Sequence, residues 1–220
     1  MFASSPPMLK TYEDYLDVLE KFATKEGISE FRIAREAFHT ATGKFEDGEP
    51  WFEIRMKMFM DWFLLDREGR SGITPIEAYL SELGHTLPSD MFEQMTYLTT
   101  TLRSAFSIAH IKGNLLLLDD LASGGEWEVT ATSPTAGLEK SDIIDARIAY
   151  FDGGLIMCPG TVLHPREAAD RVLGIIARAR AEGMPAREIV DHLDKMRLKL
   201  DKYSNVRIQH IYRHPNDTRL

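Results

Sequence analysis

The chain has 220 residues and a formal net charge of −8, with 44% hydrophobic and 27% charged residues, which is the composition of a soluble globular protein large enough to bury a core. Its single cysteine excludes a disulfide framework within one chain and a zinc site made of cysteines. No apolar run reaches the ~18 residues of a membrane-spanning helix, and residues 1–10 lack the basic and apolar regions of a secretory signal, so we expect a cytoplasmic protein.

After a disordered lead-in at residues 1–10, residues 11–103 are predicted to form a bundle of helices. The strongest start signals are Thr11, Ser29 and the TPIE sequence at residues 74–77, which combines a capping box with proline at the first helical position. The expected helices cover approximately residues 11–26, 29–42, 52–66, 75–83 and 89–103.

The third helix is the one around which we expect the bundle to form, because apolar residues cover most of its circumference. Glu53, Lys57 and Asp61 make one thin charged line along it, with the spacing of an exposed helical edge. Arg55 and Asp66 project into the apolar part. The favoured interpretation is an arginine that snorkels to solvent and an aspartate that caps the next turn or pairs with the following arginine. The alternative is a buried charge network or a ligand-facing pair.

Residues 104–220 change to the two-residue alternation of short strands. Turn signals lie at residues 112–114, 123–125 and 152–154. Before the last of these turns, Ile144, Ala146, Ile148 and Tyr150 alternate on one face of a strand. Four or five such strands predict a small antiparallel sheet or a partly open barrel.

Two helices and a last strand are predicted to follow the sheet. The helices cover residues 165–183 and about 185–203, and the alternation in VRIQHIY predicts a strand over residues 206–212. The expected fold class is therefore α+β. An N-terminal helical bundle is followed by a small antiparallel sheet or partly open barrel, which the C-terminal helices cover.

The sequence contains no catalytic, nucleotide-binding or calcium-binding signature. Cys158 lies in the apolar LIMCPG segment, which favours a buried structural thiol over a nucleophile. His210 and His214 lie four residues apart, but a metal site needs two further ligands. His164 precedes a proline and is interpreted as a cap or a core histidine. We therefore expect no metal, no cofactor and no catalytic residue.

Charge is distributed unevenly: residues 1–103 carry −7, residues 104–163 carry −5 and residues 164–220 carry +4. The favoured interpretation is that the basic C-terminal part docks on the acidic parts of the chain. The alternative is a nucleic-acid-binding surface, whose affinity falls steeply as salt rises. The candidate residues for such a surface are Arg178, Arg180, Arg187, Lys195, Arg197, Lys199 and Lys202.

Two regions resemble known families. AREAFHTATGKF, FEIRMKMFMDWFLLDR and TPIEAYL, within residues 30–83, are similar to the helical domain of uncharacterised bacterial proteins that accompany SEC-C-type proteins, although the zinc-binding cysteines of a SEC-C tail are absent. This family implies no reaction and so assigns no catalytic residue. Residues 178–193 resemble the helix–Gly–helix segment of bacterial helix-turn-helix proteins, in which the second helix reads DNA.

The function expected first is that of a non-catalytic bacterial cytoplasmic protein with a regulatory or scaffold role, which binds a protein partner or a second copy of itself. Methionine-rich helical faces can form adaptable binding surfaces of this kind. One alternative is the nucleic-acid-binding regulator described above. The other is a small-molecule-binding protein or enzyme with a pocket between the bundle and the sheet, whose polar groups are Arg55, Asp66, Arg147 and His164.

Overall fold

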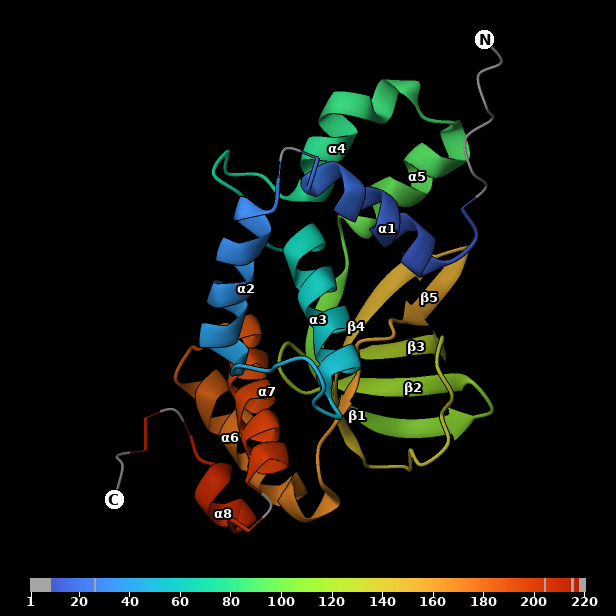
Figure 1. Cartoon of the computed structure of the whole chain (residues 1–220). Coiled ribbons are helices and arrows are strands. Elements are labelled where there is room, and N and C mark those ends of the chain that lie inside the picture. The colour runs from blue at the N-terminus through green and yellow to red at the C-terminus, as the bar shows by residue number, and fades with distance from the viewer. Residues whose placement is uncertain (1–8, 26, 204, 215, 218–220) are drawn as a thin grey trace.

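The first half of the chain forms the five predicted helices (Figure 1). The structure is a computed structural model, which describes residues 9–25, 27–203, 205–214 and 216–217. Most of the lead-in that was predicted to be disordered therefore lies outside the described residues. The helices are α1 (Tyr12–Ala23), α2 (Ser29–Thr42), α3 (Phe52–Leu65), α4 (Pro75–Leu83) and α5 (Ser89–Leu98), and a 3-10 helix (Gly84–Thr86) follows α4.

Local capping explains where two of these helices begin. The Oγ1 of Thr11 accepts a hydrogen bond from the Asp14 N–H at 3.2 Å, and the Asp14 carboxylate accepts one from the Thr11 N–H at 2.9 Å. Thr74 and Glu77 make the same reciprocal pair at the start of α4, as predicted. Ser29 differs from the prediction, because it is the first residue of α2 and makes no capping hydrogen bond.

Helix α5 ends at Leu98, earlier than the predicted residue 103. The hydroxyls of Thr99 and Thr100 donate to backbone carbonyls three residues earlier, at 2.7 and 2.9 Å. Such side-chain hydrogen bonds compete with the helical pattern and favour its end. Arg103 therefore belongs to the first strand and not to the bundle.

The second half of the chain contains a closed five-stranded barrel. Strand β1 pairs with both β2 and β4, so the order β1-β2-β3-β5-β4 closes on itself, and β6 adds to β4. All pairs are antiparallel except β3 with β5, which run parallel. The strands are β1 (Leu102–Lys112), β2 (Leu115–Asp120), β3 (Glu126–Ala131), β4 (Ile143–Phe151), β5 (Gly154–Met157) and β6 (Val162–Leu163). The α+β class is confirmed. Of the two predicted forms, a small antiparallel sheet or a partly open barrel, the barrel is the one present, and it is closed and contains one parallel pair.

The length of strand β1 explains how the barrel closes. Strand β1 has 11 residues: residues 102–107 pair with β4 and residues 106–112 pair with β2. A register shift between Ile108 and His110 bends the strand between its two partners. Closure leaves fewer unpaired strand edges than an open sheet does.

The two faces of strand β4 lie in different environments. Ile144, Ala146 and Ile148 point into the barrel and belong to its buried cluster, as the alternation predicted. Tyr150 leaves that pattern, because it is 39% exposed and packs edge-to-face on Tyr97 of α5. The opposite face of β4 points towards the helices and carries polar residues, which are described below.

After β6, the described residues form helices and connecting loops, with no further strand. A 3-10 helix (Arg166–Ala168) leads into α6 (Ala169–Ala181), α7 (Ala186–Lys202) and α8 (Ile208–Ile211). The predicted strand over residues 206–212 is wrong, because this segment forms α8. Ile208, Ile211 and Tyr212 have the i, i+3, i+4 spacing of a helix and pack on the cluster of α6 and α7. None of the described helices is both long and apolar enough to cross a membrane.

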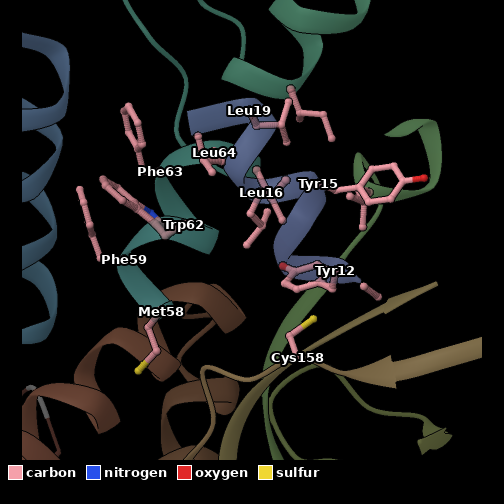
Figure 2. Packing of buried hydrophobic residues seen from close by; sticks show 14 of the residues in the cluster. Tyr12, Tyr15, Leu16, Leu19, Met58, Phe59, Trp62, Phe63, Leu64 and Cys158 are labelled. Atoms are coloured by element: carbon pink, nitrogen blue, oxygen red, sulfur yellow. The ribbon is translucent and has the colours of Figure 1, made fainter. Parts of the chain in front are cut away.

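Helix α3 lies at the centre of the molecule, with α1 and α2 packed against it (Figure 1). Figure 2 shows Phe59, Trp62 and Phe63 of α3 within the buried cluster of the bundle. The same cluster extends beyond the bundle to Cys158, which follows β5, and to Leu198 of α7. The prediction of a helix buried on several sides is confirmed, and residues from the barrel region and from α7 join the core of the bundle.

Candidate functional site

Eight charged side chains lie where the bundle, the barrel and α7 meet, and we call this group the interlayer network. Burying charges is costly unless each charge is paired, so the arrangement of the network must be specific. Its members are Arg55 and Asp61 of α3, Asp66 directly after it, Arg103 of β1, Asp145 and Arg147 of β4, and Asp191 and Asp194 of α7.

Arg147 is the centre of one half of the network. Its guanidinium donates to both carboxylate oxygens of Asp66, at 3.0 Å to Oδ1, and also to the hydroxyl of Thr101. Its Nε lies 3.8 Å from Oδ2 of Asp61, whose Oδ1 accepts a hydrogen bond from the Tyr12 hydroxyl at 2.8 Å. Asp66 therefore pairs with a strand arginine 81 positions away. The favoured interpretation had predicted a pair with the neighbouring arginine instead.

The other half of the network surrounds Asp194, which is fully buried. Arg103 donates to Asp191 at 2.7 Å and also to the carboxylate of Asp194. Arg55 donates from Nη2 to the Asp194 carbonyl at 3.1 Å, and its Nη1 lies 3.5 Å from Asp194 Oδ1. Arg55 is only 1% exposed, so the interpretation that it snorkels to solvent is wrong. The alternative of a buried charge network describes Arg55 and Asp66 correctly.

His164 lies in a buried polar chain beside this network. Its Nε2 is 2.8 Å from Oδ2 of Asp145, and its Nδ1 is 2.9 Å from the hydroxyl of Tyr212. With a proton on Nε2, the imidazole donates to the carboxylate and accepts from the tyrosine, which satisfies both ring nitrogens. Each of the three side chains is about 1% exposed, so His164 is a core histidine.

The electrostatics of the network favour proton uptake. Burial raises the pKa of Asp61 to about 6, although the attraction of Arg147 and the hydrogen bond from Tyr12 oppose the shift. Burial likewise raises the pKa of Asp194 against the attraction of Arg103. The network holds more carboxylates than guanidinium groups, so it carries an excess of negative formal charge when all of them are ionised.

A small cavity lies inside the network. It leaves about 10 Å³ for the centre of a water-sized sphere, which is at the lower limit for one water molecule. Asp145 Oδ1 and Arg147 Nε have no hydrogen-bond partner among the described residues, and both side chains line this cavity. The remaining lining residues are Met58, Asp61, Arg103, Ala146 and Gly160.

An open groove lies on the other side of Asp61, between α1 and α3, and has a volume of about 220 Å³. We call it the α1–α3 groove. Its apolar floor includes Leu16, Met56, Met60 and Pro159, and Tyr12 and Asp61 also line it. Its charged rim consists of Glu13, Asp17 and Glu20 of α1 and of Glu53 and Lys57 of α3.

Sequence reasoning missed this groove. Glu53, Lys57 and Asp61 were predicted to be one exposed charged line, but Asp61 is only 4% exposed. It faces inward because α1 packs over it and supplies the hydroxyl of Tyr12. The three acidic residues of α1 lie on one face of that helix in the sequence, but nothing in the sequence shows that this face lies beside α3.

The basic residues proposed for nucleic-acid binding mostly contact their own chain. Lys195 donates to the Thr40 carbonyl at 3.0 Å, and Arg187 lies over the Trp62 ring at 5.6 Å, so α7 docks on the bundle. Lys199 is exposed. The other four candidates bind groups of the same chain: Arg178 pairs with Glu182 and Asp217, and Lys202 pairs with Glu49. Arg180 donates to the Leu121 carbonyl, and Arg197 binds the Leu163 carbonyl and Asp201.

The sequence raised a reactive thiol and a metal site as possibilities. Cys158 is buried, and burial raises the pKa of its thiol, so the reactive thiolate is disfavoured. Within the described residues, no group of three or more His, Cys, Asp or Glu side chains could hold a metal ion. The chain matches no known protein family, no curated protein and no solved structure. Its resemblance to the helical domain of uncharacterised bacterial proteins stays a prediction.

Replacing Arg55 with methionine tests whether its role is structural. We expect the free energy of unfolding to fall by about 1–3 kcal/mol, because the variant loses charge-assisted contacts to Asp194 while Arg103 still neutralises that carboxylate. Urea unfolding followed by tryptophan fluorescence measures this change, with Arg32→Met on the exposed face of α2 as the control. Unchanged stability in Arg55→Met would favour a ligand-facing role instead.

Proposed function

We propose that this chain is a non-catalytic cytoplasmic protein that acts by binding a protein partner. The α1–α3 groove is its docking site, and the partner contributes a basic amphipathic segment. The observation that carries this proposal is the combination of an apolar floor with an acidic rim in one groove. An apolar face flanked by lysine or arginine residues would match both features.

The composition of the groove supports adaptable binding. Met56 and Met60 lie on its floor, and methionine side chains fit ligands of varied shape because they are unbranched and polarisable. Both are partly exposed, and so can contact a partner without rearrangement of the bundle. The rim carries four acidic residues and one lysine, Lys57, so its net negative charge attracts a basic partner from a distance and orients it in the groove.

The two alternatives have less support. A nucleic-acid surface on α6 and α7 would need cations that are available to phosphates, but most of the candidates contact carbonyls or carboxylates of the same chain. Small five-stranded barrels do bind nucleic acids in other proteins. In this barrel, however, the exposed Glu126 and Glu128 of β3 would repel phosphates. An enzyme would need a reactive group in a cleft, whereas His164 and Cys158 are buried.

Selection from a random peptide library on the immobilised full chain tests the proposal. We expect the enriched peptides to combine lysine or arginine with large apolar residues at helical spacing. An Asp17→Lys/Glu53→Lys variant changes one exposed acid on each rim and should weaken a selected peptide by at least tenfold, measured by fluorescence anisotropy.

The control is Glu126→Lys/Glu128→Lys, which makes the same change of charge on the exposed residues of β3. Binding by this control should equal that of the unaltered chain. The proposal is wrong if no such peptides are enriched, or if the rim variant and the β3 variant bind the selected peptide equally well.

A further inference from the structure

Asp61 connects the groove to the interior. It lines both the α1–α3 groove and the small cavity of the interlayer network, and it is the one network member among the residues that line the groove. Its side chain is 5% exposed. A carboxylate in this position joins a surface binding site to a buried cluster of charges.

One oxygen of this carboxylate has no hydrogen-bond partner among the described residues. Oδ1 accepts the hydrogen bond from Tyr12, but Oδ2 makes no hydrogen bond to the described residues. The nearest cation is Arg147 Nε at 3.8 Å, and the other nitrogens of that guanidinium are engaged by Asp66 and Thr101. Arg147 therefore attracts Asp61 without forming a direct hydrogen bond to it.

The charge balance of the network also favours one more cation. Its carboxylates are those of Asp61, Asp66, Asp145, Asp191 and Asp194, whereas its cations are those of Arg55, Arg103 and Arg147. An excess of buried negative charge is stabilised either by protons or by a positively charged partner. Asp61 is where a partner in the groove can reach this excess.

We propose that the α1–α3 groove recognises an aliphatic ammonium or guanidinium group, supplied by a lysine or arginine of the docked segment, and that this cation pairs with Asp61. This inference rests on the proposed function and specifies its anchor. The alkyl stem of the anchor lies along Leu16, Met56 and Met60, as the stems of lysine and arginine do on apolar surfaces. The volume of about 220 Å³ is smaller than the roughly 300–1,000 Å³ of pockets for drug-sized ligands, and suits one side chain.

Recognition of a cation by this carboxylate depends on pH. The groups that act on Asp61 are Tyr12 of α1, Arg103 of β1, Arg147 of β4 and Asp66 at the end of α3, and their balance with burial raises its pKa to about 6. Only the ionised carboxylate pairs with a cation. From this pKa, affinity is expected to be about tenfold lower at pH 5 than at pH 7.5.

The test uses two small probes of similar shape, the hexylammonium ion and hexan-1-ol. Binding is followed by NMR of the chain labelled with ¹³C at the methionine methyl groups, with Met56 and Met60 assigned from leucine variants. Hexylammonium should shift both methyl signals, with about tenfold weaker affinity at pH 5, because it remains a cation at both pH values. Hexan-1-ol should bind more weakly at pH 7.5 and show no dependence on pH.

An Asp61→Asn variant separates the carboxylate from the rest of the groove. The asparagine still accepts from Tyr12, so the variant should fold, and it should bind both probes equally and without dependence on pH. The matched control is Glu53→Gln on the rim, which should retain the pH dependence.

The inference is overturned if hexylammonium leaves the two methyl signals unchanged, or if it binds no better than hexan-1-ol at pH 7.5. The pH dependence in the unaltered chain decides the question even if Asp61→Asn does not fold. If peptides bind the groove but hexylammonium binds no better than hexan-1-ol, the proposed function stands and only the role of Asp61 as the anchor is removed.

Discussion

Replacing Arg147 with methionine is expected to lower the free energy of unfolding by about 3–5 kcal/mol, the loss seen when one partner of a buried ion pair is removed. The variant would leave Asp66 without its guanidinium and Asp61 without its nearest cation. Because Arg147 is only 2% exposed, water has little access to the position of the lost guanidinium and compensates poorly for the missing positive charge. Equilibrium unfolding in urea, monitored by circular dichroism, measures the change.

The matched control is Arg70→Met. Arg70 also pairs with a carboxylate, that of Glu30 at 2.8 Å, but its side chain is 81% exposed, so we expect a loss below about 1 kcal/mol. Adding Asp66→Asn to Arg147→Met should restore part of the lost stability, since it removes the orphaned charge. Equal losses in Arg147→Met and Arg70→Met would contradict the description of Arg147 as the centre of a buried network.

Replacing Phe59 with alanine is expected to cost about 3–5 kcal/mol, which is typical for deletion of a buried aromatic ring. Phe59 is fully buried on α3, and its ring lies 5.1 Å from that of Phe31, 5.6 Å from Phe38, 5.9 Å from Phe63 and 6.3 Å from Trp62. Removal of this ring opens a cavity that helices of the bundle fill only in part. The midpoint of thermal unfolding should fall accordingly.

Ile33→Ala on α2 is the control for this prediction, because Ile33 is 46% exposed. We expect it to change stability by no more than about 0.5 kcal/mol. A Phe59→Ala variant that unfolds at the same temperature as Ile33→Ala would show that α3 is not the centre of the core.

Features that depend on neighbouring residues could be predicted from the sequence. The caps at Thr11 and Thr74 each require a carboxylate only three positions away. The alternation of Ile144, Ala146 and Ile148 likewise identified the face of β4 that fills the barrel. In the segment 206–212, apolar residues fit both the two-residue alternation of a strand, which was predicted, and the i, i+3, i+4 spacing of a helix. Packing on α6 and α7 favours the helix.

Features that depend on distant segments could not be predicted. The sequence marks Arg55 and Asp66 as charges in an apolar region, but their partners are 139 and 81 positions away. The candidate site has the same limitation, since the groove exists only where α1 lies against α3. Arg147 and His164 were identified as candidate polar groups. A core position was one of the two interpretations of His164, but nothing in the sequence indicated that Arg147 is buried, and neither residue lines the groove.

The contacts of the two faces of β4 determine how the molecule unfolds. One face fills the barrel, and the other carries Asp145 and Arg147 to the helices, so neither half of the chain retains its contacts without the other. Backbone amides of β4 should therefore exchange hydrogen with solvent only through global unfolding. A fragment that ends after α5 would expose Asp66 and the apolar surface that covers Cys158 and Leu198, and should be degraded rapidly by proteases in the cell.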